Sequence, residues 1–454
     1  MSNRQWLVMA DPIHGILRFD RKEHELLLEI TNSRPFQRLR RVRQMGLAEF
    51  VFPGAVHSRF LHCLGALYLM TQTVEHLSHD DTGKAMLAET YEETGISLKD
   101  LLLVSILLHD IGHSPLSHTL EMVLELDVKG LSHDHYWLEK ILLEDPDLQA
   151  IWNRYNPQWP HALLDFMGRR GNKHCLASLV SSQLDMDRLD YLLRDSHFLG
   201  TNYGLIELDR LLGSIRIAQH PSGQPVVAMR EEAIPALEHY LFGRHQAYKM
   251  ALHSLDKASE ALLKKTLERF QWCREQGVST GHPAEELYQL MHDGHALTTA
   301  QYLRMDDFYL WEAIHCWSLD ASDPLLKELA NRLLRHDLLK FMDLAEFGIH
   351  QPLHMLPIAH EALRQHYEQR GLSFAFGFDE TTVKPKAMYK PHEPIWVTTR
   401  AKGVVDLSEV SSLTLSVSPN APHKHLVFLW DKTAKHFLRD LLIQRNLATL
   451  EPLE

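Results

Sequence analysis

The sequence predicts a mostly α-helical protein with a smaller α+β region in its C-terminal part. Before residue 371, apolar side chains recur at the three- and four-residue spacing of amphipathic helices. Beyond that point, glycine, proline and β-branched residues become frequent in segments such as PIWVTT, GVVDL, LTLSV and HLVFLW, which is typical of short strands. The 454 residues fit two or three domains. We expect a helical core over 1–265, a helical extension over 266–370 and a small α+β region over 371–454.

The expected helices follow one another along most of the chain. The run 98–111 is apolar on most faces, which favours a buried helix, and 36–48 has apolar residues at 36, 39, 42 and 45. Short strands are expected around 226–229 and within 371–430, followed by a helix over 433–445. In chain order, helices are expected at 22–31, 36–48, 57–79, 98–111, 176–197, 231–270, 284–293, 323–346 and 358–369.

Composition narrows the class of protein. Apolar residues make up 45% of the chain and charged residues 23%, which excludes a disordered chain, a collagen-like fibre and a disulfide-rich miniprotein. The net charge of −12 argues against a uniformly basic surface for nucleic acid. The aliphatic run 101–108 is much shorter than the ~20 residues of a membrane span, and we recognise no signal peptide. We therefore expect a cytoplasmic protein that does not use a membrane.

Cysteine and histidine usage points to the chemistry. Cys63, Cys175, Cys273 and Cys316 are far apart in the sequence, which favours neither a cysteine-bound zinc site nor a disulfide framework. Histidine, by contrast, occurs 31 times. Because imidazole titrates near neutral pH and binds metal ions, a few of these histidines are candidates for a site.

The segment LLHDIGHSPLSH, residues 107–118, is the densest group of candidates. His109 and Asp110 end an apolar helix, His113 follows one turn later, and His118 comes after Pro115. A carboxylate at the edge of a core is costly without a partner, and a divalent cation is a suitable one. The alternative is a helix C-terminus whose histidines interact favourably with the helix dipole.

Two further segments offer polar groups at helical spacing. In HSRFLHCLG, residues 57–65, Arg59 and His62 share a helix face, and an arginine beside a metal-binding histidine suits a phosphate substrate. The alternative is an amphipathic helix with a cation on its solvent side. In QLDMDRLDYLLRD, residues 183–195, the side chains of Asp187, Tyr191 and Asp195 fall on one face, which alone is more typical of a solvated surface. Asp190 and Arg194 in the same segment are spaced as a structural ion pair.

Taken together, the motifs resemble the HD-domain metal-dependent phosphohydrolases. The similarity is greatest to the branch that hydrolyses deoxynucleoside triphosphates, which includes a vertebrate enzyme with an added SAM domain and its bacterial relatives. It covers residues 11–253, so we expect an HD phosphohydrolase core in 1–265 and no SAM domain. The segments that carry it are DPIHG (11–15), PFQRLRRVRQMG (35–46), FPGAVHSRFLHCLG (52–65), LLHDIGHSPLSH (107–118) and DMDRLDYLLRDSHFLGTNYG (185–204).

The resemblance implies an activity and roles for individual residues. We expect hydrolysis of a deoxynucleoside triphosphate to deoxynucleoside and triphosphate, with a divalent cofactor (Mn, Fe, Zn, Ni or Mg) and assembly into dimers or tetramers. The implied metal ligands are His62, His109, Asp110 and Asp187, and the implied catalytic residues are His113, His118, His133, Glu121 and Asp134. The implied substrate-binding residues are Gln44, Arg59, Arg188, Tyr191, Asp195, Arg244 and Tyr248, and an effector site would use Asn32, Gln37 and Arg40.

Two departures from the family pattern keep alternatives open. Asn32 stands where the vertebrate enzyme has an aspartate that reads guanine, so we expect GTP to be a poor activator. Ala251 and Leu252 replace a Val-Tyr pair that shapes the nucleotide pocket. A different nucleotide or phosphoester, such as a monophosphate or a signalling nucleotide, is therefore an alternative substrate. A nucleotide-sensing or nucleic-acid-binding protein in which these histidines and aspartates are structural is a less favoured alternative, and the basic run 38–43 is its candidate for binding single-stranded nucleic acid.

Overall fold

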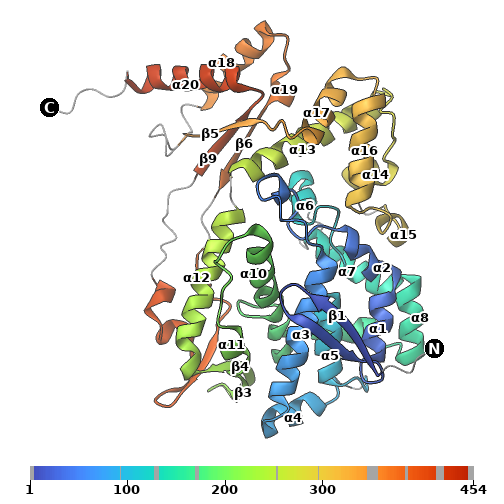
Figure 1. Cartoon of the computed structure of the whole chain (residues 1–454), viewed down its shortest axis with the longest axis vertical. Helices are drawn as coiled ribbons and strands as arrows, with labels where there is room; N and C mark the ends of the chain where they lie inside the picture. Colours follow the sequence, from blue (N-terminus) through green and yellow to red (C-terminus); the bar gives the residue numbers. More distant parts are fainter. Residues whose placement is uncertain are drawn as a thin grey trace, which may run out of the picture.

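Helices form most of the chain, and small sheets accompany them (Figure 1). The computed structural model describes residues 5–92, 94–126, 132–168, 173–251, 254–294, 296–344, 356–383, 387–415 and 424–447. The prediction of a mostly helical protein with a smaller region that contains strands is confirmed. Among these residues, no helix has both the length and the apolar character needed to cross a bilayer.

The helices and strands have the following bounds. The helices are α1 (Glu25–Asn32), α2 (Arg34–Arg38), α3 (Arg59–Leu77), α4 (Asp81–Ala88), α5 (Leu98–Leu108), α6 (His118–Leu124), α7 (His133–Glu144), α8 (Pro146–Tyr155), α9 (Trp159–Phe166), α10 (Met186–Leu199), α11 (Leu208–Leu212), α12 (Ile234–Ala251), α13 (Ser254–Glu275), α14 (Glu285–Asp293), α15 (Thr299–Tyr302), α16 (Asp307–Asp320), α17 (Pro324–Leu334), α18 (Leu356–Gln369), α19 (Phe374–Gly377) and α20 (Lys432–Leu447). The strands are β1 (Trp6–Asp11), β2 (Gly15–Asp20), β3 (Ile215–Gln219), β4 (Pro225–Arg230), β5 (Lys340–Asp343), β6 (Phe378–Val383), β7 (Trp396–Thr399), β8 (Gly403–Asp406) and β9 (Lys424–Leu429).

Three helices at the centre of the fold position the candidate site. Helix α3 packs against both α5 and α10. The side chain of Ser97 caps the start of α5, and that of Asp185 caps the start of α10. Most side chains of α3 and α5 are buried, as their apolar sequences predict. The start of α3, the end of α5 and the start of α10 therefore meet inside the protein.

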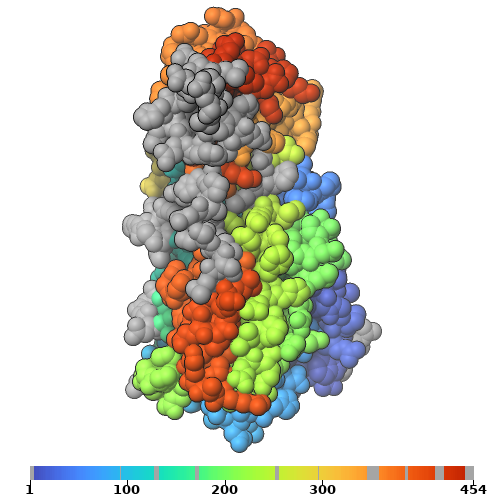
Figure 2. Space-filling model, turned by 90° about the vertical axis from the view of Figure 1, so that its left-hand side faces the viewer, coloured from blue at the N-terminus to red at the C-terminus, as the bar shows by residue number. Residues whose placement is uncertain are grey.

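A four-stranded sheet connects distant parts of the chain. Its order is β3-β4-β7-β8, and β4 pairs with β7 in parallel, with Ala228 opposite Trp396. The hairpin β3–β4 thus forms one sheet with strands from the segment 387–415. Figure 2 shows this segment, in orange-red, lying along α12, in yellow-green. A hairpin, β1–β2, and a sheet of order β5-β9-β6 complete the strands among the described residues.

For some helices, the bounds predicted from the sequence are wrong. The helix over 36–48 ends at Arg38, because Val42 is extended and its carbonyl accepts the N–H of Arg59. In 176–197, a 3₁₀ turn precedes a loop, and α10 begins after Asp185. The helix over 323–346 ends at Leu334 and is followed by strand β5.

Other segments differ from the expected strands. Of the expected strand in LTLSV, the described part is a 3₁₀ turn, and residues 416 and 417 lie outside the described residues. The hairpin β1–β2 was not predicted, because its strands are short and one of its faces is exposed.

Candidate metal centre

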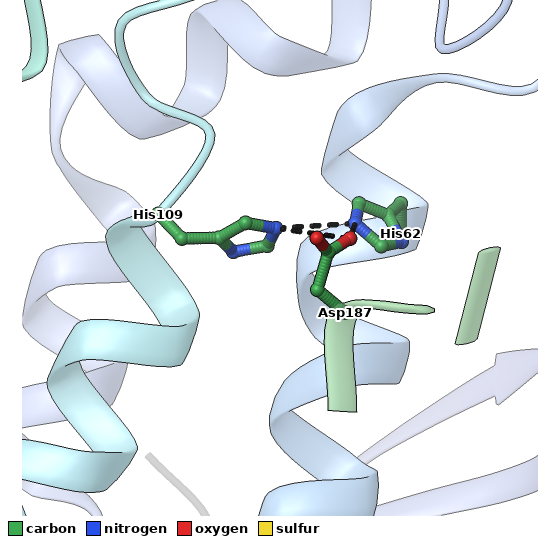
Figure 3. A group of neighbouring side chains, drawn as sticks. All are labelled: His62, His109 and Asp187. Atoms are coloured by element: carbon green, nitrogen blue, oxygen red, sulfur yellow. Dashed lines mark hydrogen bonds and ion pairs between the residues drawn. The ribbon is translucent and has the colours of Figure 1, made fainter. Parts of the chain in front are cut away.

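Two imidazoles and a carboxylate converge where the three central helices meet (Figure 3). His62 lies in the first turns of α3, His109 follows the last residue of α5, and Asp187 lies in the first turn of α10. Nε2 of His62 is 3.2 Å from Nε2 of His109 and 3.1 Å from Oδ1 of Asp187. The two carboxylate oxygens of Asp110 lie 3.4 Å from Nε2 of His109 and 3.6 Å from Nε2 of His62. The structure therefore brings together all four residues predicted as metal ligands.

Hydrogen bonds on the far side of each ring decide which nitrogen faces the centre. Nδ1 of His62 lies 2.8 Å from Oδ2 of Asp190, and Nδ1 of His109 lies 2.7 Å from the carbonyl oxygen of Ile106. Because a carboxylate and a carbonyl can only accept, each Nδ1 carries the proton and donates it. Each Nε2 then directs its lone pair at the centre, which is how ligand histidines are held in metal sites.

The spacing of these donor atoms fits a divalent cation. Two ligand atoms about 2.1 Å from one ion, at tetrahedral or octahedral angles, lie about 3.0–3.4 Å apart. The separations of His62 from His109 and Asp187 are 3.2 and 3.1 Å. Mixed imidazole and carboxylate ligands suit Mn, Fe, Zn or Ni, and Mg would suit the phosphate oxygens of a substrate.

The charges around the centre also favour a cation. Burial opposes a charge on His62, but hydrogen bonds with Asp187 and Asp190 outweigh burial and raise the pKa of His62 to about 10. Burial likewise opposes a charge on Asp187, yet His109 and His62 hold the pKa of this carboxyl below its usual range. The groups that stabilise a proton at this centre so strongly would also stabilise a divalent metal ion in place of the proton.

The chain is similar in sequence to known proteins. No family model matches the chain. The uncharacterized protein YwfO of Bacillus subtilis is 28% identical over 429 residues, which cover 93% of this chain and 91% of that protein. The deoxynucleoside triphosphate triphosphohydrolase SAMHD1 of Gallus gallus is 26% identical over 371 residues, which cover 74% of this chain and 56% of that protein.

A solved structure adds a match over the whole fold. A crystal structure of a phosphohydrolase from Bacteroides thetaiotaomicron superposes with a TM-score of 0.76 and 26% identity, covering 93% of this chain and 99% of that one. The resemblance to the HD-domain phosphohydrolases is confirmed. His109 and Asp110 are the adjacent histidine and aspartate of the segment 107–118, one of the segments that carry this resemblance.

Asp190 holds the His62 ring on the side that faces away from the candidate metal centre. Its carboxylate binds His62, lies 2.6 Å from Nε2 of His14 and pairs with Arg194 at 2.8 Å. The predicted ion pair with Arg194 is confirmed, but the contacts with the two histidines were not foreseen. Gly65 of α3 makes room for the pair, since a Cβ there would lie 2.0 Å from Oδ1 of Asp190. Asp11 accepts a further hydrogen bond from Arg194 at 2.9 Å.

Arg59 links the metal centre to the loop between His113 and His118. Its Nη1 lies 2.5 Å from Oδ2 of Asp110, and its Nε donates to Oγ of Ser117 at 2.6 Å. Leu116 and Ser117 both have a φ of 55°, which is uncommon for residues other than glycine. This loop is therefore held in a conformation that needs support from its neighbours.

Glu121 joins two of the predicted catalytic histidines. Its carboxylate oxygens lie 3.0 Å from Nδ1 of His113 and 2.8 Å from Nδ1 of His118. Nε2 of His113 lies 3.2 Å from Asp110 and 3.9 Å from Asp134. Burial opposes a charge on His113, but Glu121 and Asp110 raise its pKa to about 9. Because the His118 side chain is 64% exposed, this row of groups runs from a predicted metal ligand to the surface.

His133 lies beside this row and contacts a tyrosine. Its Nε2 lies 3.3 Å from the hydroxyl of Tyr302, which donates its own proton to the carbonyl of Gly112 at 2.6 Å. Burial lowers the pKa of His133 to about 4, so the ring is neutral at pH 7 and donates to Tyr302. Sequence reasoning missed Tyr302, because its position far along the chain gives no local signal.

Arg188 and Tyr191 lie together beside Asp187 on α10. Nη1 of Arg188 donates to the hydroxyl of Tyr191 at 3.2 Å, and its Nε donates to the carbonyl of Ser182 at 2.5 Å. Arg188, the residue after Asp187, thus holds its guanidinium against Ser182 and Tyr191, whereas Arg59 pairs with Asp110.

His57 brings two further predicted substrate residues together. Its Nε2 lies 2.8 Å from Oδ1 of Asp195, and its carbonyl accepts the N–H of Gln44 at 3.0 Å. Among the described residues, Oε1 of Gln44 is buried without a hydrogen-bond partner. An unpaired buried acceptor of this kind is available for a donor on a ligand.

Arg244 and Tyr248 lie one turn apart on α12. Arg244 donates to the carbonyl of Gln183 at 3.1 Å, to its Oε1 at 3.2 Å and to the carbonyl of Met388 at 2.6 Å. These contacts connect α12 to the segment 387–415. Leu252 and His253, where the sequence departs from the family pattern, lie outside the described residues.

The predicted effector residues are neighbours at the start of the chain. Gln37 donates to the carbonyl of Thr31 at 2.8 Å and accepts from Arg40 at 2.8 Å. The Arg40 guanidinium lies 3.6 Å from the ring centre of Phe60, and Asn32, the last residue of α1, is exposed. The three residues form a polar surface near the start of α3.

Proposed function

We propose that this protein hydrolyses deoxynucleoside triphosphates to deoxynucleoside and triphosphate in a metal-dependent reaction. The observation that carries the proposal is the pair of Nε2 lone pairs of His62 and His109, directed at one point beside Asp187 and flanked by Arg59 and Arg188. The deoxynucleoside triphosphate triphosphohydrolase SAMHD1, a relative that aligns over 74% of the chain, supports this substrate class.

The residues around the centre have complementary tasks in this reaction. His62, His109, Asp110 and Asp187 would hold a divalent ion, which would supply a Lewis acid for a phosphoryl oxygen and for the attacking water. Arg59 and Arg188 neutralise negative charge that develops on the leaving phosphates. Glu121 orients the ring of His118, which is exposed enough to exchange a proton with the leaving group or with water.

Product analysis tests the proposal. Purified enzyme is incubated with each deoxynucleoside triphosphate and several metals in ¹⁸O-labelled water, and the products are resolved by ³¹P spectra and mass. We expect deoxynucleoside and intact triphosphate without early diphosphate, and we expect Asp187→Ala to form neither product. Accumulation of a deoxynucleoside diphosphate would show that attack occurs at the other end of the phosphates.

A shorter phosphoester is a second candidate substrate. Of the three arginines expected to bind phosphates, Arg244 uses its guanidinium for Gln183 and Met388. The two remaining cations, Arg59 and Arg188, suit a substrate with one or two phosphate groups better than one with three phosphate groups. The same assay with nucleoside monophosphates distinguishes the two candidates, since preference for the monophosphate by at least tenfold in kcat/KM would favour the second.

We also propose that the enzyme acts in the cytoplasm as a homo-oligomer. The resemblance described above supports the homo-oligomer, and the location is the one expected from the sequence. Light scattering on the purified protein would show a mass at least twice that of the 52.5 kDa chain.

A further inference from the structure

Tyr302, the last residue of α15, is fully buried against α7 and the loop that follows α5. Its ring is stacked on the ring of Trp137 in α7, with the ring centres 3.8 Å apart and the planes at 3°. The Arg38 guanidinium lies 5.2 Å from the centre of the Tyr302 ring. Because an indole and a cation both hold this ring, its hydroxyl is kept in one place.

The hydroxyl of Tyr302 has two partners, and each has one possible role. The carbonyl oxygen of Gly112, 2.6 Å away, can only accept, so Tyr302 donates its proton there. Burial raises the pKa of Tyr302 above its usual range, so this proton is retained at neutral pH. Nε2 of His133 lies 3.3 Å from the same hydroxyl and must therefore carry a proton and donate it.

These two hydrogen bonds decide the tautomer of His133. Burial lowers the pKa of His133 to about 4, so the ring carries a single proton at pH 7. With that proton on Nε2, Nδ1 keeps its lone pair, and no hydrogen bond from the described residues occupies it. The charges of Glu121 and His113 both act on this ring, so it lies beside the row of groups that runs from Asp110 to His118.

The close approach of α7 to the loop after α5 leaves little freedom at this point. A Cβ on Gly112 would lie 2.0 Å from the carbonyl oxygen of Asp134, so the contact depends on glycine. Arg38 donates to the carbonyl of His113 at 2.8 Å, next to the carbonyl that Tyr302 binds. Two side chains from distant parts of the chain thus hold two consecutive carbonyl groups of this loop.

We propose that Tyr302 is a positioning residue for catalysis. Its hydroxyl holds His133 in the tautomer with the proton on Nε2, which keeps Nδ1 of His133 as a proton acceptor beside His113 and Glu121. Because Tyr302 belongs to the segment 266–370, this segment then contributes to catalysis through a side-chain hydroxyl. The catalytic role rests on the proposed hydrolysis, whereas the tautomer does not, so the two are tested separately.

The tautomer is tested without any substrate. Correlation spectra of protein labelled with ¹⁵N-histidine distinguish a proton on Nε2 from a proton on Nδ1, and the signals that disappear in His133→Gln belong to His133. We expect a neutral ring with the proton on Nε2 in the wild type at pH 7, and a mixture of both tautomers in Tyr302→Phe. A doubly protonated ring or a proton on Nδ1 in the wild type would overturn the proposal, as would an unchanged tautomer in Tyr302→Phe.

Matched variants test the catalytic role on whichever phosphoester the wild type hydrolyses. Tyr302→Phe keeps the stacked ring and removes the hydroxyl, so kcat should fall at least tenfold while KM and metal content stay within twofold of the wild type. The control is Tyr367→Phe, since Tyr367 is equally buried and its hydroxyl donates to the carbonyl of Gly377 at 3.0 Å and accepts the N–H of Trp430 at 3.1 Å. This control should keep the wild-type kcat. An equal fall in kcat in both variants, or in neither, would overturn the proposal.

A double-mutant cycle shows whether Tyr302 acts through His133. His133→Gln retains an amide that can donate to the Tyr302 hydroxyl but has no ring nitrogen to accept a proton. Tyr302→Phe should therefore lower kcat less than twofold in the His133→Gln background, compared with at least tenfold in the wild type. Equal falls in both backgrounds would overturn a role through His133. A wild type that hydrolyses no phosphoester would contradict the proposed function and the catalytic role of Tyr302, but not the tautomer.

Discussion

Asp307 accepts the backbone N–H of Leu116 at 2.8 Å, although the two residues are far apart in the sequence. Its other carboxylate oxygen accepts the N–H of Arg43 at 2.9 Å. Through these bonds, the first turn of α16 holds the loop between His113 and His118 in its left-handed conformation. A residue of the segment 266–370 therefore contributes directly to the geometry of the loop between His113 and His118, which are predicted catalytic residues.

Replacing Asp307 by alanine should destabilise the protein and impair catalysis. The change leaves the buried N–H of Leu116 and the partly buried N–H of Arg43 without acceptors, and a buried unpaired group costs about 1–3 kcal/mol. Unfolding in urea should show this loss, and the rate should fall while metal content stays near that of the wild type. Lys327→Ala, on the neighbouring α17, is the control. An Asp307→Ala protein as stable as the wild type would show that water or a shifted loop replaces the carboxylate.

The stability due to Asp307 should depend on pH. Burial raises the pKa of this carboxyl to about 6, despite the opposing hydrogen bonds from Leu116 and Arg43. The unfolded chain has a value near ~3.9, so the folded state binds the proton more tightly and gains stability as the pH falls from 6 to 4. The stability difference between wild type and Asp307→Asn should shift in favour of the wild type by about 1–3 kcal/mol over this range. A shift of the opposite sign would contradict the raised pKa.

Asp190→Asn should weaken metal binding without removing a ligand. The amide is a poorer acceptor for Nδ1 of His62 than the carboxylate, so it holds the ring and its tautomer less firmly. Loss of such a supporting carboxylate costs about 10–100-fold in metal affinity. Competition with a chelator measures the change, and Asp209→Asn on the exposed side of α11 should behave as wild type. Equal metal affinities of Asp190→Asn and the wild type would show that Asp190 does not support metal binding through His62.

His118→Ala should reduce the rate while sparing both the fold and the metal. The side chain is 64% exposed, so its removal should change stability little. Loss of a general acid or base lowers kcat by about 10²–10⁴-fold. Steady-state kinetics with metal analysis checks this, with His392→Ala as the exposed control. A normal kcat in His118→Ala would exclude His118 from proton transfer.

Gln183→Ala should loosen the contact between the core and segment 387–415. The Gln183 amide donates to the carbonyls of Lys390 and Glu393 and accepts from the N–H of Lys390 and from Arg244. Removing these bonds in a site that is 1% exposed should cost about 2–4 kcal/mol. Limited proteolysis should then cut within 387–415 sooner than in the wild type, whereas Gln365→Ala on α18 should not change the pattern. Unaltered cleavage would show that the paired strands β4 and β7 hold the segment without Gln183.

The sequence carries local signals for the predicted metal ligands but not for the residues around them. His62, His109, Asp110 and Asp187 can be predicted because each lies in a short motif at the end of a helix with an apolar face. Asp307 and Tyr302 reach the same region only through the folded chain, so no spacing in the sequence reveals them. Helical spacing predicts the pairing of Asp190 with Arg194. It does not show the contacts of Asp190 with His14 and His62, which lie in other parts of the chain.

The errors in the fold have a similar origin. Apolar residues at 36, 39, 42 and 45 fit a helix, yet Val42 and Arg43 instead pair with Arg59 and Ser58 at the start of α3. The sequence of the loop 180–185 has the same helical pattern as the helix that follows it. The side chain of Asp185 nevertheless ends this pattern, because it accepts hydrogen bonds from the N–H groups of Ser182 and Arg188. In both segments, hydrogen bonds that the apolar spacing does not show determine the backbone conformation.

The parallel pairing of β4 with β7 has a consequence for how the chain folds as it is made. The ribosome completes the hairpin β3–β4 long before it reaches residue 396, so one edge of β4 is left without a partner during most of synthesis. Such an edge is a template for association with other chains. The nascent protein is thus most prone to aggregation in this interval, and translation that stalls before residue 396 should increase its demand for chaperones.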